Sequence, residues 1–174
     1  MKISIINCKD ENFEPYVVRA LECFGSVLFE DIELYDSIEI TIIFFDQLED
    51  MGEAVIDDFV KRGSPKKFSI SLDYTMGVDR IFETLAHEMV HVKQFALEEL
   101  NGSLSEWKGV KKDPDEIEYY FRPWEIEAMG FEIGLVRKFV TEEKLWKVFK
   151  GISNPNSYKL KRKDILWRKG YPKI

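Results

Sequence analysis

The two histidines of the chain lie four residues apart, at His87 and His91, and Glu88 directly follows the first of them. On an α-helix, residues i and i+4 share one face with Cβ atoms about 5–6 Å apart, so both imidazoles can reach one metal ion. Glu88 lies about 100° further round the helix, beside such an ion, where its carboxylate can accept a proton from water. This H-E-x-x-H spacing predicts a metal site with a general base, which is the chemistry of a zinc hydrolase.

The residues around the motif predict the helix that would carry it. Apolar side chains recur at helical spacing and indicate a buried stripe, formed by Ile81, Leu85, Met89, Val92 and Ala96. The motif residues fall beside this stripe, at the rim of the core. We expect the helix to begin with Asp79 as its N-cap and to end at Asn101-Gly102. Because a histidine pair can also occur on a helix by chance, the metal hypothesis requires a third ligand.

A carboxylate is the expected third ligand, since a catalytic zinc usually takes three protein ligands and leaves a fourth position for water. No third histidine exists, and Cys8 and Cys23 lie far upstream without C-x-x-C spacing. Pro123 suits the first turn of a second helix, from which Glu125 and Glu127 would project. These two side chains are about 200° apart on a helix, so only one of them would face the metal. Spacing alone does not separate them.

Two segments, Thr84 to Gln94 and Pro123 to Ala128, resemble small H-E-x-x-H metallopeptidase-like proteins of phages and bacteria, which are zincins of the gluzincin type. In those proteins the first helix reads roughly H-E-x-V-H-V-K-Q and the second P-W-E-I-E-A. Gluzincins commonly carry the glutamate ligand as the first residue of an E-x-x-A motif, whose alanine lets the two helices approach. The resemblance therefore points to Glu125 as the third ligand, with Glu127 as the alternative.

The pattern along the chain predicts an α+β domain. Strands are indicated at Lys2 to Asn7, Ser37 to Phe45, Ala54 to Val60 and Lys67 to Leu72. A helix that opens at Glu14-Pro15 and stops at Gly25 would follow the first strand.

The second half of the chain is expected to be mainly helical. The second ligand helix would run from Pro123 to about Val140, and Thr141-Glu142-Glu143 is typical of a cap that opens another helix ending near Lys150-Gly151. The irregular stretch from Gly102 to Arg122 joins the two ligand helices. Long connections in compact domains are often functional, so this stretch is expected to form one wall of a cleft.

This order of elements resembles the catalytic half of the zincin fold, in which a small mixed β-sheet packs against the H-E-x-x-H helix and a second ligand-bearing helix. In zincins an edge strand ahead of the active-site helix binds extended peptide through backbone hydrogen bonds. By chain order that strand would be Ala54 to Val60, although an ordinary hairpin strand fits equally well. We expect one domain, with residues 1–155 zincin-like and residues 156–174 a basic tail packed on it.

Composition and charge limit the class of protein. The chain has 174 residues, of which 45% are hydrophobic and 14% aromatic, enough for a buried core. Met1 to Cys8 is too short and mixed for a signal peptide, and no apolar run approaches a membrane span. The two cysteines show no disulfide pattern. We therefore expect a cytoplasmic protein that does not bind membranes.

The net charge of −7 is unevenly distributed. Residues 1–60 hold 15 acids against 3 bases, and residues 136–174 hold 12 bases against 3 acids. The acidic start argues against nucleic-acid binding. The basic end could contact an anionic partner, or it could lie across the acidic half, with Trp167 and Tyr171 providing apolar anchors.

The leading hypothesis is a zinc-dependent hydrolase, a metallopeptidase that binds one Zn²⁺ per chain and acts on a peptide or protein substrate. Glu88 would be the general base, and the ion would be held by His87, His91 and Glu125. The charged tetrahedral intermediate needs a hydrogen-bond donor, for which the candidates before the second helix are Tyr119, Tyr120 and Arg122.

The alternative is a catalytically silent zincin-fold protein with a binding or regulatory role, such as a phage accessory protein. The intact Glu88 argues against this alternative, because a structural metal site has no use for a base.

Overall fold

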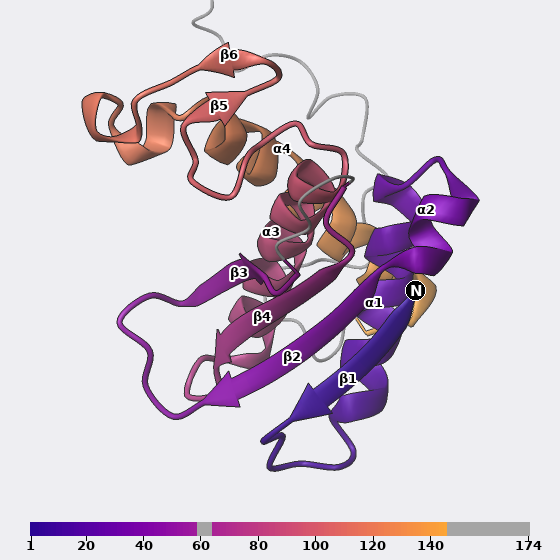
Figure 1. Ribbon diagram of the computed structural model, residues 1–174. Coiled ribbons are helices and arrows are strands. Elements are labelled where there is room, and N and C mark those ends of the chain that lie inside the picture. The colour runs from indigo at the N-terminus through magenta and orange to yellow at the C-terminus, as the bar shows by residue number, and fades with distance from the viewer. Residues whose placement is uncertain (59–63, 146–174) are drawn as a thin grey trace, which may run out of the picture.

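The computed structural model describes residues 1–58 and 64–145 (Figure 1). The secondary-structure elements, in chain order, are β1 (Lys2–Ile6), α1 (Glu14–Leu28), α2 (Ile32–Ser37), β2 (Glu39–Phe45), β3 (Gly52–Ile56), β4 (Lys67–Asp73), α3 (Val78–Ala96), β5 (Glu106–Trp107), β6 (Val110–Lys111), the 3₁₀ turns η1 (Pro114–Glu116) and η2 (Tyr119–Phe121), and α4 (Pro123–Glu142). None of the helices in these described residues is long and apolar enough to cross a membrane.

The four long strands form one mixed sheet in the order β1-β2-β4-β3. Strands β1, β2 and β4 are parallel, and β3 pairs antiparallel with β4 at the edge of the sheet. Alternation within the strands gives the sheet one apolar face, which in β2 and β4 consists of Ile40, Ile42, Phe44, Phe68, Ile70 and Leu72. The mixed sheet agrees with the expected α+β class.

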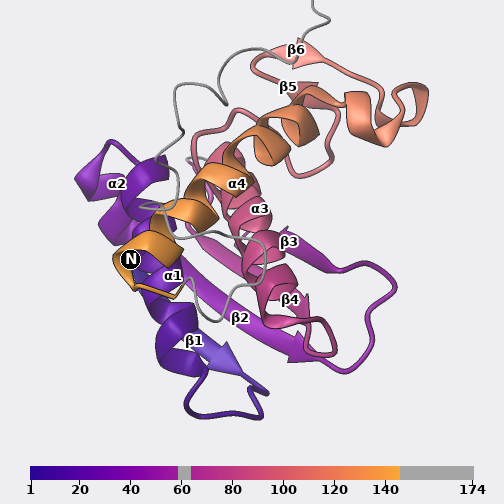
Figure 2. The same ribbon diagram turned by 180° about the vertical axis from the view of Figure 1, so that it is seen from behind.

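Helices α1, α3 and α4 lie on that side of the sheet, and α4 packs across α1 and α3 away from the strands, as the view from behind shows (Figure 2). Their shared core contains Phe139 of α4, whose ring centroid lies 6.0 Å from that of Phe24 in α1 and 5.1 Å from that of Phe82 in α3. Burial of three aromatic rings between three helices sets how α4 lies on α3. This packing matters for function because α3 and α4 carry the candidate site.

The four strands and the two helices expected to carry the metal ligands are found where the sequence predicts them, but several boundaries differ. Helix α1 continues past Gly25 to Leu28, since Gly25 is a packing residue: a Cβ there would lie 2.6 Å from the Tyr35 ring. Strand β3 spans Gly52–Ile56 instead of Ala54 to Val60. The chain leaves the strand at Asp57, and positions 59 and 60 lie outside the described residues.

Helix α3 begins after Gly77 as N-cap instead of Asp79, and it ends at Ala96 instead of Asn101-Gly102. The early end follows from tertiary pairing: Glu98 has a φ of 56°, and Leu100 forms a β-bridge with Trp107. Short helix α2 was not predicted.

Helix α4 starts at Pro123 as expected but runs to Glu142. The prediction that Thr141-Glu142-Glu143 caps a new helix is therefore wrong, because the first two of these residues form the last turn of α4. The remainder of that expected helix, from position 146, and the expected packing of residues 156–174 on the domain lie outside the described residues.

Candidate metal centre

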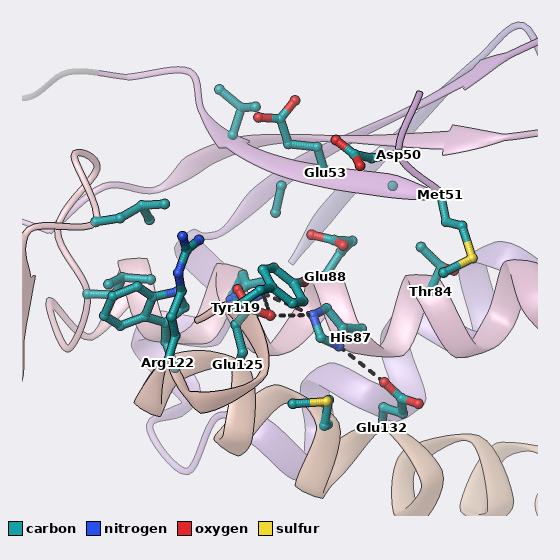
Figure 3. A pocket seen from close by; sticks show the side chains of 18 of the residues that line it. Asp50, Met51, Glu53, Thr84, His87, Glu88, Tyr119, Arg122, Glu125 and Glu132 are labelled. Atoms are coloured by element: carbon teal, nitrogen blue, oxygen red, sulfur yellow. Dashed lines mark hydrogen bonds and ion pairs between the residues drawn. The ribbon is translucent and has the colours of Figure 1, made fainter. Parts of the chain in front are cut away.

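The two histidines line a cleft of about 880 Å³ between the edge strand β3, helix α3 and the start of α4 (Figure 3). One wall comes from the connection between α3 and α4, through Gly102, Leu104, Tyr119, Tyr120 and Arg122. The prediction that this connection forms a wall of the cleft is confirmed. Its short β5–β6 hairpin and two 3₁₀ turns project beyond the end of the sheet (Figure 1).

Helix α3 presents the motif as its periodicity predicts. Each member of the apolar stripe is buried, with exposed fractions between 0% and 3% for Ile81, Leu85, Met89, Val92 and Ala96. His87 and His91 lie beside the stripe on the side that faces the cleft. The helix is therefore held by its apolar face while its histidines remain within reach of solvent.

Glu125, in the first turn of α4, brings its carboxylate to both histidines. Its Oε2 lies 3.1 Å from His87 Nε2 and 3.5 Å from His91 Nε2, and the two Nε2 atoms are 3.2 Å apart. Ligand atoms bonded tetrahedrally to zinc at about 2.0–2.1 Å are about 3.3–3.4 Å from one another. The three atoms could therefore hold one metal ion.

The second nitrogen of each imidazole also has a partner. His87 Nδ1 lies 3.1 Å from Glu132 Oε2, and His91 Nδ1 lies 2.8 Å from Gln94 Oε1. Both partners are acceptors, so in the metal-binding form each Nδ1 carries the proton and each Nε2 presents a lone pair. Two lone pairs and a carboxylate then converge on one point, which requires a cation.

In the metal-free protein, protons supply that positive charge. Burial alone would lower the pKa of His87, but hydrogen bonds to Glu125 and Glu132 outweigh burial and raise this pKa to about 10. The pKa of His91 is also raised, against its burial, by Glu125 and Glu88. Burial opposes ionisation of Glu125, yet hydrogen bonds from the two histidines hold its pKa well below the usual range. A metal ion must therefore displace protons from this site.

Glu88 lies beside the three ligand residues, on the β3 side of His87 (Figure 3). Its side chain is buried, with 6% of the residue exposed. Burial raises the pKa of Glu88, and this effect exceeds the opposing influence of the two histidines and of a hydrogen bond from the Ala54 backbone. A carboxylate with a raised pKa is a stronger base toward water at neutral pH.

Glu127, the alternative third ligand, points away from the two histidines. One of its oxygens lies 2.9 Å from Gln94 Nε2, and the other lies 3.1 Å from Lys108 Nζ. The geometry therefore places Glu125 in the ligand cluster and leaves Glu127 in a neighbouring group of ion pairs.

Of the three donor candidates, Tyr119 lies nearest the ligands, where its hydroxyl donates a hydrogen bond to Glu125. Tyr120 lines the same cleft with 63% of the residue exposed. Arg122 is engaged elsewhere: its guanidinium donates to the carbonyl oxygens of Ile117 and Pro114, 3.2 and 2.8 Å away. Arg122 thus holds the wall of the cleft in place.

Two residues of the centre were missed from the sequence, Gln94 and Glu132. Gln94 follows His91 by three positions on α3, and Glu132 follows Glu125 by seven positions on α4. Residues at these spacings share a helix face, so the helical period already marks them as neighbours of the ligands.

A comparison with protein-family models, with curated proteins and with solved structures finds no match to this chain.

Removal of the Glu125 carboxylate should abolish tight metal binding. We expect Glu125→Ala to weaken zinc affinity by more than about 100-fold, beyond the range typical of residues that only support a ligand. Glu127→Ala, on the same helix turn, removes a carboxylate that contacts Gln94 instead of the histidines and should weaken affinity less than Glu125→Ala does. Competition with a chromophoric chelator measures both. If Glu127→Ala loses zinc while Glu125→Ala keeps it, the ligand assignment is wrong.

Zinc uptake should release protons, with an affinity that rises with pH. His87, with its pKa raised to about 10, is protonated in the metal-free protein between pH 6 and 8, and zinc requires the deprotonated nitrogen. Each proton displaced makes the apparent affinity rise about tenfold per pH unit. Titration calorimetry in buffers of different ionisation enthalpy counts the protons. An affinity that does not change with pH, without proton release, would contradict this account of the metal-free site.

Proposed function

We propose that the protein is a zinc-dependent hydrolase that cleaves peptide bonds, with a zincin-like arrangement of its site. The observation that supports this most is the buried carboxylate of Glu88 directly beside three converging ligand atoms in an open cleft. A metal site that only stabilises a fold needs neither the base nor the cleft.

Zinc is the proposed ion because two imidazoles and one carboxylate form a donor set that catalytic zinc sites use. Three protein ligands leave one coordination position for a water molecule or substrate. When bound, zinc would act as a Lewis acid that polarises a carbonyl group and lowers the pKa of water.

Two side chains, Glu88 and Tyr119, would supply the other catalytic groups. Glu88 accepts a proton from the attacking water and passes it to the amine that leaves, a role that suits its raised pKa. The Tyr119 hydroxyl, already next to Glu125, is the donor best positioned to stabilise the oxyanion that develops on the scissile carbonyl.

Strand β3 offers backbone groups for an extended substrate. Hydrogen bonds to β4 flank this strand at both ends, from Asp73 N–H to Met51 O and from Asp57 N–H to Lys67 O. Hydrogen-bonded pairs alternate in antiparallel strands, so the even-numbered residues Gly52, Ala54 and Ile56 turn their backbone groups away from β4. The Ala54 N–H already donates to Glu88, which leaves its carbonyl oxygen and the backbone groups of Gly52 and Ile56 for a substrate. These residues line the cleft, and a peptide can add there as a further strand.

The alternative function, a zincin-fold binding protein without activity, shares the metal site and differs at Glu88. A silent protein would gain nothing from burying a carboxylate whose ionisation burial disfavours. We therefore favour the hydrolase.

Glu88→Gln should abolish most hydrolysis without loss of zinc. The amide keeps the shape of the side chain but cannot accept the proton, and general acid–base catalysis is typically worth about 10²–10⁴-fold. Zinc-loaded wild type, Glu88→Gln and the exposed control Glu98→Gln would be compared on a mixed library of internally quenched peptides, with zinc content measured for each. Equal turnover by Glu88→Gln would exclude Glu88 as the base, and a zinc-loaded wild type that cleaves nothing would favour the silent alternative.

A further inference from the structure

We propose that Gln94 and Glu127 form a positioning pair that fixes the orientation and proton of His91, and that Lys108 ties this pair to the β5–β6 hairpin. The inference rests on the proposed metal site, but it concerns how the site is held and does not depend on hydrolysis. Gln94 and Glu127 touch neither the ion nor the substrate in this account, so they are positioning residues.

Gln94 is fully buried, with 0% of the residue exposed, and each polar atom of its amide has a partner. Its Oε1 accepts from His91 Nδ1 at 2.8 Å. Its Nε2 donates to the Trp124 carbonyl oxygen at 3.0 Å and to Glu127 at 2.9 Å. A flipped amide would direct its N–H groups at a donor and its oxygen at two acceptors, so only one orientation is satisfied.

Glu127 fixes the orientation of the Gln94 amide, because an ionised carboxylate only accepts hydrogen bonds and must therefore face the amide nitrogen. It is held by two lysines, with Lys108 Nζ at 3.1 Å and Lys93 Nζ at 3.4 Å. The same lysines contact Glu99 at 3.5 and 2.5 Å. This alternating cluster of two acids and two bases is largely shielded except at Lys108, so it holds the Glu127 carboxylate in place.

Lys108 links the cluster to the hairpin. It lies at the turn between β5 and β6 with a φ of 49°, and its ammonium group lies 4.6 Å from the centre of the Trp107 ring. Trp107 in turn packs on Trp124, with ring centroids 6.4 Å apart, immediately before Glu125 in α4. The hairpin therefore contacts the centre twice, through the backbone that carries Glu125 and through the pair that orients His91.

The consequence is a difference between the two histidines. His87 is oriented by Glu132, a single charged residue on α4, whereas His91 depends on a neutral amide whose direction is set by Glu127. A neutral acceptor orients the ring without adding a further negative charge to a centre that already contains Glu88 and Glu125.

Variants at these two positions test the inference through zinc affinity and through the imidazole N–H signal of His91 in ¹⁵N-resolved NMR spectra. Gln94→Leu should lower zinc affinity about 10–100-fold, the range expected when an outer partner of a ligand is lost. It should also remove the protected Nδ1–H signal of His91. Melting of the metal-free protein, measured alongside, reports any general loss of fold.

Exchange of the two side chains separates positioning from simple packing. Gln94→Glu alone sets a carboxylate against Glu127 and the Trp124 carbonyl, so zinc affinity should fall. The double variant Gln94→Glu/Glu127→Gln restores an amide donor opposite a carboxylate acceptor, although the new carboxylate still faces the Trp124 carbonyl oxygen, so it should recover part of the affinity and the His91 N–H signal. Lys108→Met should cause a several-fold loss of affinity, whereas the exposed hairpin control Lys111→Met should cause none.

Wild-type affinity in Gln94→Leu, or a double variant no better than Gln94→Glu, would overturn the positioning role. A wild-type protein that binds no zinc would overturn this inference together with the metal site. A protein that binds zinc and shows the Gln94 effects but cleaves no peptide would leave this inference standing and refute only the proposed hydrolase.

Discussion

The structure depends on the convergence of three electron-rich atoms on one point. His87 Nε2, His91 Nε2 and Glu125 Oε2 lie 3.1 to 3.5 Å from one another, although two lone pairs and a carboxylate repel when no cation lies between them. Glu132 and Gln94 keep a proton on the Nδ1 atom of each imidazole. In a neutral imidazole the lone pair then lies on Nε2, facing the other two atoms. Either protons on the histidines or a bound metal ion can neutralise this repulsion. The spacing of the three atoms is close to that of tetrahedral ligands and suits a metal ion.

The rest of the fold supplies the rigidity that this convergence requires. Helix α3 is held on the sheet by its apolar stripe, and α4 is held on α3 by residues such as Trp124 and Ala128, both with 0% exposure. Trp124 and Ala128 lie on either side of Glu125 in the sequence, so the packing that joins the helices also sets the position of the carboxylate. Core packing tolerates little displacement, which keeps ligand atoms from two helices in register.

The position of the H-E-x-x-H motif on α3 could be predicted from the sequence, because it depends on local periodicity. The stripe of α3 determines which face is buried, and that in turn places His87, Glu88 and His91 at the rim of the core. The choice between Glu125 and Glu127 could not be made from spacing, since it depends on how α4 is rotated against α3. The resemblance to gluzincins favoured Glu125, and the geometry places that residue in the ligand cluster.

The ends of helices that depend on contacts with residues distant in the sequence could also not be predicted from local sequence patterns. Gly25 resembles a helix stop in the sequence, but it lies inside α1 because the ring of Tyr35 packs against it. The end of α3 depends on the bridge between Leu100 and Trp107, which forms only when the hairpin folds back. The Gln94–Glu127 pair joins α3 and α4 in the same way and is visible only in three dimensions.

The central claim is that one zinc ion is bound by these three residues, and anomalous diffraction tests it most directly. Crystals of the zinc-loaded protein, prepared without a histidine tag, would be measured on both sides of the zinc absorption edge. The account predicts one strong anomalous difference peak per chain, about 2.0–2.2 Å from His87 Nε2, His91 Nε2 and a Glu125 oxygen. The absence of a peak there, or an ion bound through Glu127 instead, would contradict it.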